Sequence, residues 1–200
     1  MDTTRTGGLR ERKKEQTRAA LSWAALRLTV ERGFDNVKVE DIATEAGVSP
    51  RTYNNYFSSK AEAIVWRHLN RARQAADVIR ARPADEPLWD AVTAAVLAHA
   101  GSEHDEPDPE WTAGVRLMMT EPALLGEMHK AYAAANDACA EAIAERIGAD
   151  PHDMYPRLVA GAVGVATQLA SELWLTADPP VPLAALLRDA LDELGGGLAR

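Results

Sequence analysis

Apolar positions along most of the chain recur at intervals of three and four residues, which is the spacing of one face of an α-helix. The first such stripe consists of Leu21, Ala24, Ala25 and Leu28. It predicts an amphipathic helix over residues 11–32, and Gly33 follows at a place where glycine commonly ends a helix. No segment shows the alternation of apolar and polar residues that predicts a half-buried strand. The pattern therefore predicts an all-α fold.

Turn and capping residues divide the next stretch into short helices. Residues 39–46 predict a second helix of two turns, which ends at Gly47. Ser49 is a typical N-cap residue, and Pro50 follows at the first helical position, where proline is well tolerated. A third, very short helix is therefore expected directly after a glycine turn.

The remainder is also predicted to be helical. Ser59 and Glu62 have the spacing of a capping box, which predicts a fourth helix from about residue 60 to about residue 80. Five more helices are predicted between Pro-rich, Gly-rich or acidic breaks, over residues 88–100, 111–120, 122–147, 155–176 and 183–194. The total is about nine helices, preceded by a flexible arm of some ten residues that contains Gly7 and Gly8.

Composition favours a cytoplasmic protein. The chain has 200 residues, of which 46% are hydrophobic and only 6% aromatic, as is typical of a soluble helical protein. A single cysteine, Cys139, excludes an intramolecular disulfide. Residues 1–16 contain no apolar segment of the kind found in signal peptides, and the longest apolar stretch, residues 158–166, is short for a membrane span. No membrane partner is expected.

Charge is unevenly distributed between the two expected domains. Residues 1–60, which comprise the arm and the first three helices, carry 11 basic and 8 acidic residues. Residues 61–200 carry 11 basic and 22 acidic residues, so their net charge is −11, against +3 for residues 1–60. A basic front on an acidic body predicts an anionic partner for residues 1–60 alone.

Sequence motifs argue against an enzyme. The chain has no G-x-S-x-G, P-loop, G-x-G-x-x-G or H-E-x-x-H motif, and Cys139 has no histidine at a useful spacing. We expect no cofactor and no metal. A helical interaction module is the other alternative, but it would not need the side chains of Arg51, Asn55, Tyr56 and Lys60 together on one surface.

The second helix, its glycine turn and the third helix have the proportions of a helix-turn-helix, whose second helix enters the major groove of DNA. Within residues 15–64, the sequence contains Gly33–Phe34, the block VEDIATEAGVS (residues 39–49) and the pattern T-x-x-x-Y-F-x-S-K (residues 52–60). These motifs resemble the DNA-binding segment of TetR-family transcriptional regulators. The resemblance implies a ligand-responsive regulator, usually a repressor, although an activator remains an alternative.

Physical chemistry supplies candidate DNA contacts on the third helix. Arg51 suits a guanine edge, Asn55 an adenine edge, and Tyr53 the methyl group of thymine. Ser49 and Thr52 suit phosphate or the helix cap. Tyr56 and Lys60 resemble family residues that bind backbone phosphate.

Several of these assignments have alternatives. One of Tyr53 and Tyr56 is expected to be mainly packed, and Asn54 to face solvent more than Asn55. A basic run contributes further candidate phosphate or minor-groove contacts at Arg10, Lys13 and Lys14. Lys38 stands where the family usually has a threonine that caps the second helix; lysine cannot cap it but still suits phosphate.

For the C-terminal half, the resemblance implies a small-molecule pocket and a homodimer interface formed by the last two helices. Large aromatic, methionine and amide side chains are the pocket candidates: Trp89, Trp111, Met118, Met119, Met128, Tyr132, Gln168 and Trp174. The dimer candidates are Val159, Val163, Leu183, Leu187 and Leu191. Both helices could instead be core of a monomer.

The segment from TEPAL (residues 120–124) onward resembles the C-terminal domain of mycofactocin-type regulators, a subgroup associated with acyl-CoA-like effectors. That resemblance favours an acyl or other lipophilic effector. The acidic body is a poor match for a highly anionic one. The combined prediction is a homodimer on a pseudo-palindromic operator in double-stranded DNA, released when the effector binds.

Overall fold

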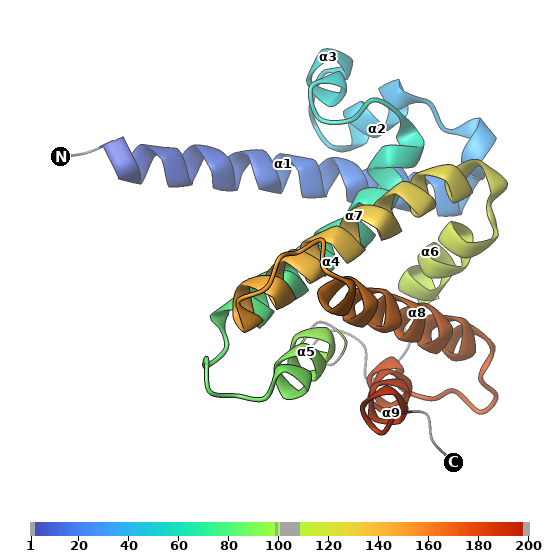
Figure 1. The fold of residues 1–200 in the computed structure, drawn as a ribbon. Helices are drawn as coiled ribbons and strands as arrows, with labels where there is room; N and C mark the ends of the chain where they lie inside the picture. Colours follow the sequence, from blue (N-terminus) through green and yellow to red (C-terminus); the bar gives the residue numbers. More distant parts are fainter. Residues whose placement is uncertain (1–2, 99, 101–108, 198–200) are drawn as a thin grey trace. The chain divides into compact units, whose positions relative to one another are not determined.

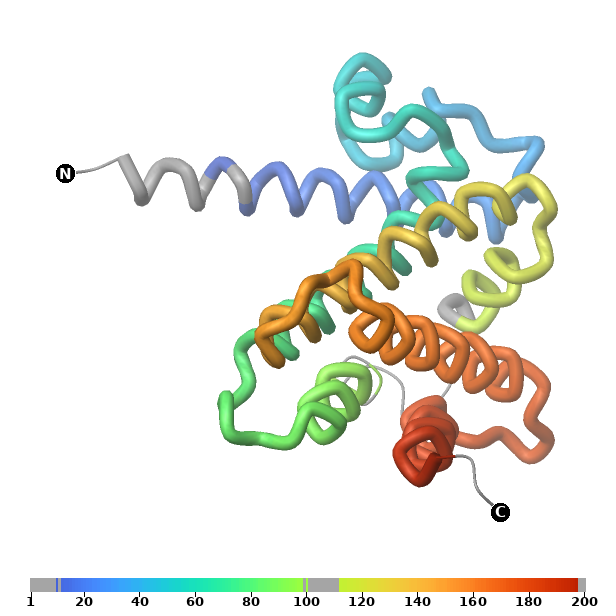
Figure 2. The backbone as a smooth tube through the Cα atoms, in the orientation of Figure 1, coloured from blue at the N-terminus to red at the C-terminus, as the bar shows by residue number. Residues whose placement is uncertain are grey.

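A computed structural model describes residues 3–98, 100 and 109–197, and folds them into nine α-helices and a short 3-10 helix without any strand (Figures 1 and 2). The helices are α1 (Thr3–Arg32), η1 (Phe34–Asn36), α2 (Val39–Glu45), α3 (Pro50–Asn54), α4 (Lys60–Ala81), α5 (Leu88–Leu97), α6 (Pro109–Thr120), α7 (Pro122–Ile147), α8 (Met154–Thr176) and α9 (Leu183–Gly195). The predicted all-α class is confirmed.

The largest departure from the predicted boundaries is at the start of the chain. α1 begins at Thr3, so the residues expected to form a flexible arm are helical from there onward. The segment ERKKEQTR (residues 11–18) consists mostly of strong helix formers, which favours propagation of the helix toward its N-terminus despite two glycines. At the other end, Gly33 adopts a φ of 80°, as the glycine at the end of the predicted helix requires.

The chain divides into two compact units. Unit 1 comprises Met1–Arg67 and Ala113–Met128. Its core is built from α1, α2, α3 and the start of α4, whose fully buried side chains are Leu21, Leu28, Ile42, Tyr53, Phe57 and Ile64. Gly114 of α6 lies against Leu26 of α1, and a Cβ there would be only 2.9 Å from the leucine side chain.

Unit 2 comprises His68–Thr112 and His129–Arg200. α8 packs along α9, and α9 packs on α5. The buried cluster between the helices consists largely of alanine with a few larger side chains: Ala76, Ile79, Val92, Ala95, Ala140, Ala142, Ile143, Ala160, Val163 and Leu191. Helix α8 is long and apolar enough to meet a length-and-composition criterion for a membrane span, a criterion that core helices of soluble proteins also meet.

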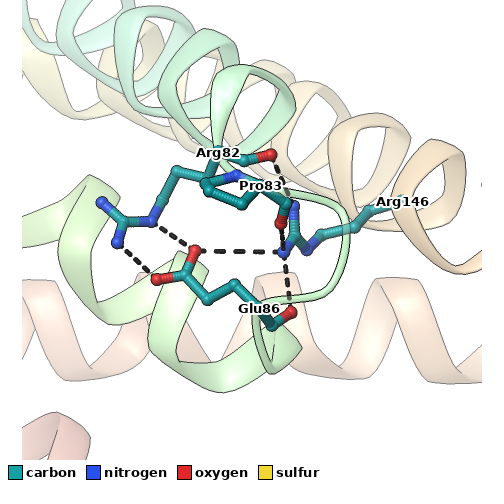
Figure 3. Close-up of polar contacts among 4 residues, drawn as sticks. All are labelled: Arg82, Pro83, Glu86 and Arg146. Carbon is teal, nitrogen blue, oxygen red and sulfur yellow. Dashed lines mark hydrogen bonds and ion pairs between the residues drawn. The ribbon is translucent and has the colours of Figure 1, made fainter.

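An arginine from the end of α7 closes the connection between α4 and α5 (Figure 3). The side chain of Arg146 is 7% exposed. It donates to the carbonyl oxygens of Arg82 at 3.2 Å and Glu86 at 2.7 Å, and also to that of Pro83. The Glu86 carboxylate balances the charge from 3.9 Å and also pairs with Arg82. These carbonyls lie between two helices; that of Pro83 also accepts the backbone N–H of Glu86 at 3.2 Å, so Arg146 reinforces a turn that one backbone bond already closes.

Replacing Arg146 with methionine is expected to lower the free energy of unfolding by about 3 kcal/mol, because three carbonyls and one carboxylate lose a mostly buried donor. Urea denaturation measures the change. Arg188→Met, at an exposed arginine on α9, is the matched control and should leave the transition in place. Equal midpoints for the two variants would contradict the assigned role.

Candidate nucleic-acid interface

The start of helix α2 is capped by the side chain of its third residue, Asp41, and not by that of the N-cap residue, Lys38. The Asp41 carboxylate accepts the backbone N–H of Lys38 at 3.0 Å. The Lys38 side chain makes no capping bond, as predicted from the chemistry of lysine, and it is exposed. An acidic residue three positions after the N-cap was the signal that sequence analysis overlooked. The ammonium of Lys38 is therefore placed on the surface at the start of α2, where its proposed phosphate contact remains a prediction.

The turn between α2 and α3 is a Schellman motif. Val48 donates its N–H to the carbonyl of Ala43 at 2.9 Å, and Gly47 donates to that of Thr44 at 3.0 Å. Gly47 has a φ of 69°, a conformation that other residues adopt only with strain. The motif determines the direction in which the chain enters α3.

The first turn of α3 is built as predicted. Ser49 accepts the backbone N–H of Thr52 at 3.1 Å, its hydroxyl lies 2.9 Å from the Thr52 hydroxyl, and Pro50 occupies the first helical position. Both hydroxyls thus serve the cap. Ser49 is exposed and Thr52 half-buried, so a phosphate contact would have to be added to the capping bonds.

Tyr53 is a core residue, and the prediction that it packs against a thymine methyl is wrong. Its side chain is completely buried, its ring lies 5.9 Å from that of Phe57, and its hydroxyl donates to the carbonyl of Ser59 at 2.9 Å. Burial, reinforced by the charge of Glu62, raises the pKa of the hydroxyl well above its usual value. Tyr53 and Phe57 are four residues apart and share the inward side of the helical turn. Of the two tyrosines, Tyr53 is the packed one.

The opposite side of α3 carries polar side chains that are available to a ligand. Arg51, Asn54 and Asn55 are exposed, and Tyr56 is half-buried. Within the described part of the chain, the side chains of these four residues form no hydrogen bond or ion pair. A guanidinium fork and two primary amides therefore project from a rigidly seated helix, which is the donor and acceptor set that major-groove base edges match. Exposure alone does not separate Asn54 from Asn55.

Lys60 has a structural role that the sequence did not indicate. Its ammonium donates to the carbonyls of Phe34 and Val37, the latter at 3.0 Å, and lies 4.0 Å from the centre of the Phe34 ring. It thereby ties the start of α4 to the η1 segment. Two of its three N–H groups are used, which leaves one for a phosphate.

Arg18 of α1 was not among the predicted residues, although it orients the end of α3. Its guanidinium donates to the carbonyl of Tyr56 at 3.3 Å and lies 5.6 Å and 6.0 Å from the ring centres of Phe57 and Trp66. The signal was a cation on an apolar stripe, since Arg18 precedes Leu21 by three residues on the buried face of α1.

The basic residues near the start of α1 share a helical face. Arg10, Lys13 and Lys14 are exposed, and their spacing of three and four residues places them side by side on a helix. Helical structure thus converts the charge run of the sequence into a directed basic stripe. Its contact with phosphate or the minor groove remains a prediction.

The predicted pocket residues are divided between the two units. Met118, Met119 and Met128 belong to unit 1, and the first and last of these are buried. Tyr132, Gln168, Trp89 and Trp174 belong to unit 2. The side chain of Trp111 lies outside the described residues.

Within unit 2, the predicted residues differ in how much of each side chain is available. Trp174 is buried, and Gln168 is exposed and donates to Glu172 at 3.0 Å. The Trp89 indole packs closely on α9, where a Cβ at Gly195 would lie 2.4 Å from its nitrogen. Trp89 is therefore engaged in holding α5 against α9.

Tyr132 has a ring partner that was not predicted. The His68 ring of α4 meets the Tyr132 ring edge-on, with centroids 4.8 Å apart and an interplanar angle of 79°. Burial lowers the pKa of His68 to about 4, and the nearby positive charge of Arg71 acts in the same direction. Burial and Glu172 raise the pKa of Tyr132. A lone histidine in a helix gives no sequence signal of this placement.

Most of the predicted dimer contacts are core residues of the single chain. Leu191, Leu187 and Val163 are 0%, 3% and 6% exposed, so the prediction that they face a second subunit is wrong. Val159 is half-buried against the cluster that contains Val163 and Leu191, and Leu183 against the one that contains Leu187. α8 is apolar on two faces, and the predicted residues lie on the face that packs against its own chain.

Apart from Ile147 at the end of α7, the large exposed apolar side chains of unit 2 among the described residues lie on the outer face of α8. They are Met154, Tyr155, Leu158, Val165, Leu169 and Leu173. From Leu158 onward they recur at helical spacing, so they form a continuous stripe. We call this set the α8 stripe.

Comparison with known proteins matches both parts of the chain. Residues 23–63 match the family model for bacterial regulatory proteins of the tetR family, and residues 86–199 match that for the MftR C-terminal domain. The chain is 34% identical over 194 residues to MftR of Mycobacterium tuberculosis, described as a mycofactocin biosynthesis transcriptional regulator, with 94% of each chain covered. It is 32% identical to the HTH-type transcriptional regulator TcmR of Streptomyces glaucescens, covering 94% of this chain and 86% of that one.

Solved structures support the fold. FadR of Thermus thermophilus, a TetR-family repressor crystallised with lauroyl-CoA, superposes with a TM-score of 0.57 at 20% identity, covering 92% of this chain and 95% of that one. The fatty acid degradation regulator FadR of Bacillus halodurans gives a TM-score of 0.59 at 18% identity, with coverages of 92% and 97%. At this level of identity the likeness establishes the fold alone.

The low pKa of His68 predicts a loss of stability in acid. Above pH 6.5 the imidazole is neutral in both states; as the pH falls from 6.5 toward 4, the unfolded chain takes up a proton that the folded chain does not. We expect this histidine to contribute about 3 kcal/mol to the loss of stability over that interval. Urea denaturation of wild type and His68→Phe across the interval isolates the contribution.

His129→Phe, at an exposed histidine of α7, is the control for the substitution itself. If His68→Phe loses as much stability as wild type between pH 6.5 and pH 4, the assignment to His68 is incorrect.

Proposed function

The chain belongs to the TetR family of transcriptional regulators, and we propose that it is a repressor that binds a pseudo-palindromic operator as a homodimer and releases it when an apolar effector binds. Members of this family bind DNA through the N-terminal part and a ligand through the C-terminal part, and they are regulators rather than enzymes. The observation that best supports the operator-binding part of the proposal is the exposed Arg51, Asn54 and Asn55 set on a helix seated by the buried Tyr53.

In the proposed complex, α3 lies in the major groove. Arg51 contacts a guanine through O6 and N7, and Asn55 contacts an adenine. Tyr56, the remaining N–H of Lys60 and the cap of α3 contact phosphates, with Lys38 and the basic stripe of α1 alongside. The net charge of +3 in residues 1–60 attracts the duplex, whereas the charge of −11 in residues 61–200 is repelled by it.

Homodimerisation is supported by the α8 stripe. Leu158, Val165, Leu169 and Leu173 are each more than half exposed, and a continuous apolar stripe of this kind marks an interaction surface. A second copy is the proposed occupant, because a palindromic operator requires two DNA-binding units related by a two-fold axis. We call the α2–α3 unit of each copy (residues 39–54) the reading head.

A lipophilic effector is supported by the apolar packing between the helices of unit 2 and by the likeness to a repressor crystallised with lauroyl-CoA. Helix α4 has its first turns in unit 1 and the remainder in unit 2, so we propose that it transmits effector binding to the reading head. The coupling needed is of the order of 1–3 kcal/mol. Activation instead of repression remains the alternative, because the activator FasR of Mycolicibacterium smegmatis is 28% identical. In vitro transcription from the operator separates the two.

The reading head is tested by gel shift on the DNA that flanks the gene. Arg51→Ala should weaken specific binding roughly 5- to 150-fold and relax the preference at one base pair, whereas Lys13→Ala should weaken binding to all sequences and reduce the salt slope by about 1. Arg188→Ala, at an exposed site on α9, should have no effect. The proposal would be refuted if the wild-type protein bound none of the flanking DNA specifically.

The interface is tested by sedimentation. Leu169→Glu places a charge in the centre of the α8 stripe and should yield a folded monomer, because Leu169 is 51% exposed in the single chain. Leu125→Glu, at a 53% exposed leucine of α7, is the matched control and should remain dimeric. Leu187→Glu should instead unfold the protein, since that side chain is core. A Leu169→Glu variant that sediments as wild-type dimer would exclude this surface.

A further inference from the structure

His68 and Tyr132 are neighbouring side chains in unit 2 whose rings pack together and whose polar atoms have no protein partner among the described residues. Both are more than half buried, and they contact each other only through their rings, at 4.8 Å between centroids. Within the described part of the chain, neither the imidazole nitrogens nor the tyrosine hydroxyl forms a hydrogen bond. The polar atoms of both side chains are not among the fully buried, unpaired atoms of the described residues, so they remain open to a hydrogen-bonding ligand.

The surroundings of the pair disfavour a charge on either ring. Arg71 and burial oppose a positive charge on His68, as its pKa of about 4 shows. Glu172 and burial oppose a negative charge on Tyr132, whose pKa is raised. The Glu172 carboxylate accepts a hydrogen bond from the Gln168 amide. At neutral pH both rings are therefore uncharged, and burial penalises any ion brought to them.

We propose that His68 and Tyr132 form the polar end of the effector site and bind an uncharged hydrogen-bonding group, such as a hydroxyl or carbonyl, carried by an otherwise apolar effector. A neutral imidazole has one donor and one acceptor, and a phenol has the same, so the pair can match either group. The assignment rests on the proposed effector-binding function and adds to it the chemistry of the recognised group. The polar pair fixes orientation within a site whose affinity comes from apolar contact.

The first measurement concerns the protein without effector. Tyr132→Phe removes only the hydroxyl and keeps the ring contact with His68. Since the hydroxyl has no partner, the melting temperature should be unchanged or higher than that of wild type. A melting temperature lower by several degrees would show that the hydroxyl is used by the fold, and would overturn the proposal.

The second measurement is calorimetric titration of the full-length protein at pH 7 with three probes that share a ten-carbon chain: decanol, decanoate and decylammonium. Decanol should bind at least about tenfold more tightly than either ion. Tyr132→Phe and His68→Phe should each weaken decanol binding about tenfold and leave the ions within about twofold. His152→Phe, at an exposed histidine between α7 and α8, is the control and should bind all three probes as wild type does.

The proposal is overturned if decanoate or decylammonium binds as tightly as decanol, if Tyr132→Phe leaves decanol binding unchanged, or if none of the probes binds. A gel shift separates failure of this proposal from failure of the proposed regulator function. Without probe, Tyr132→Phe should bind operator DNA as wild type does. Tyr132-dependent decanol binding in a protein that binds no operator would retain this site and refute the regulator function.

Discussion

The position of helix α3 depends above all on the burial of the Tyr53 side chain. A five-residue helix has no stability of its own, because so few hydrogen bonds do not offset the cost of ordering the backbone. α3 persists because this side chain is wholly buried and its hydroxyl is bonded to the Ser59 carbonyl. The Ser49 cap sets its first turn, and Arg18 binds the Tyr56 carbonyl just beyond its last. The exposed side chains are therefore presented from a fixed backbone.

Element boundaries were largely predictable from sequence because local chemistry determines them. Pro122 and Gly148 bracket α7, and the predicted span of that helix agrees with the observed one. The Gly47 turn and the Ser49 cap were likewise readable, since each involves hydrogen bonds within a few residues. The start of α1 was misplaced because two glycines suggested a break, whereas the following polar residues propagate the helix.

Side-chain roles were harder to predict where they depend on distant residues. Helical spacing shows that Val163 and Leu169 of α8 lie on apolar faces, but not which face meets α9 and which remains exposed. Tyr53 and Tyr56 are chemically identical, and only the packing of α3 separates them. Arg18 and Lys60 are cations that a sequence assigns to DNA or solvent, although each binds carbonyls more than twenty residues away.

The separation of labour on α3 has an evolutionary consequence. Tyr53, Phe57 and the Ser49 cap maintain the fold, whereas Arg51, Asn54 and Asn55 project outward without internal partners among the described residues. Mutation at the outward positions can thus change which operator is read with little effect on folding, because surface substitutions away from special features have small stability costs. Duplicated copies of such a gene can acquire new targets through one or two substitutions, each passing through a folded intermediate.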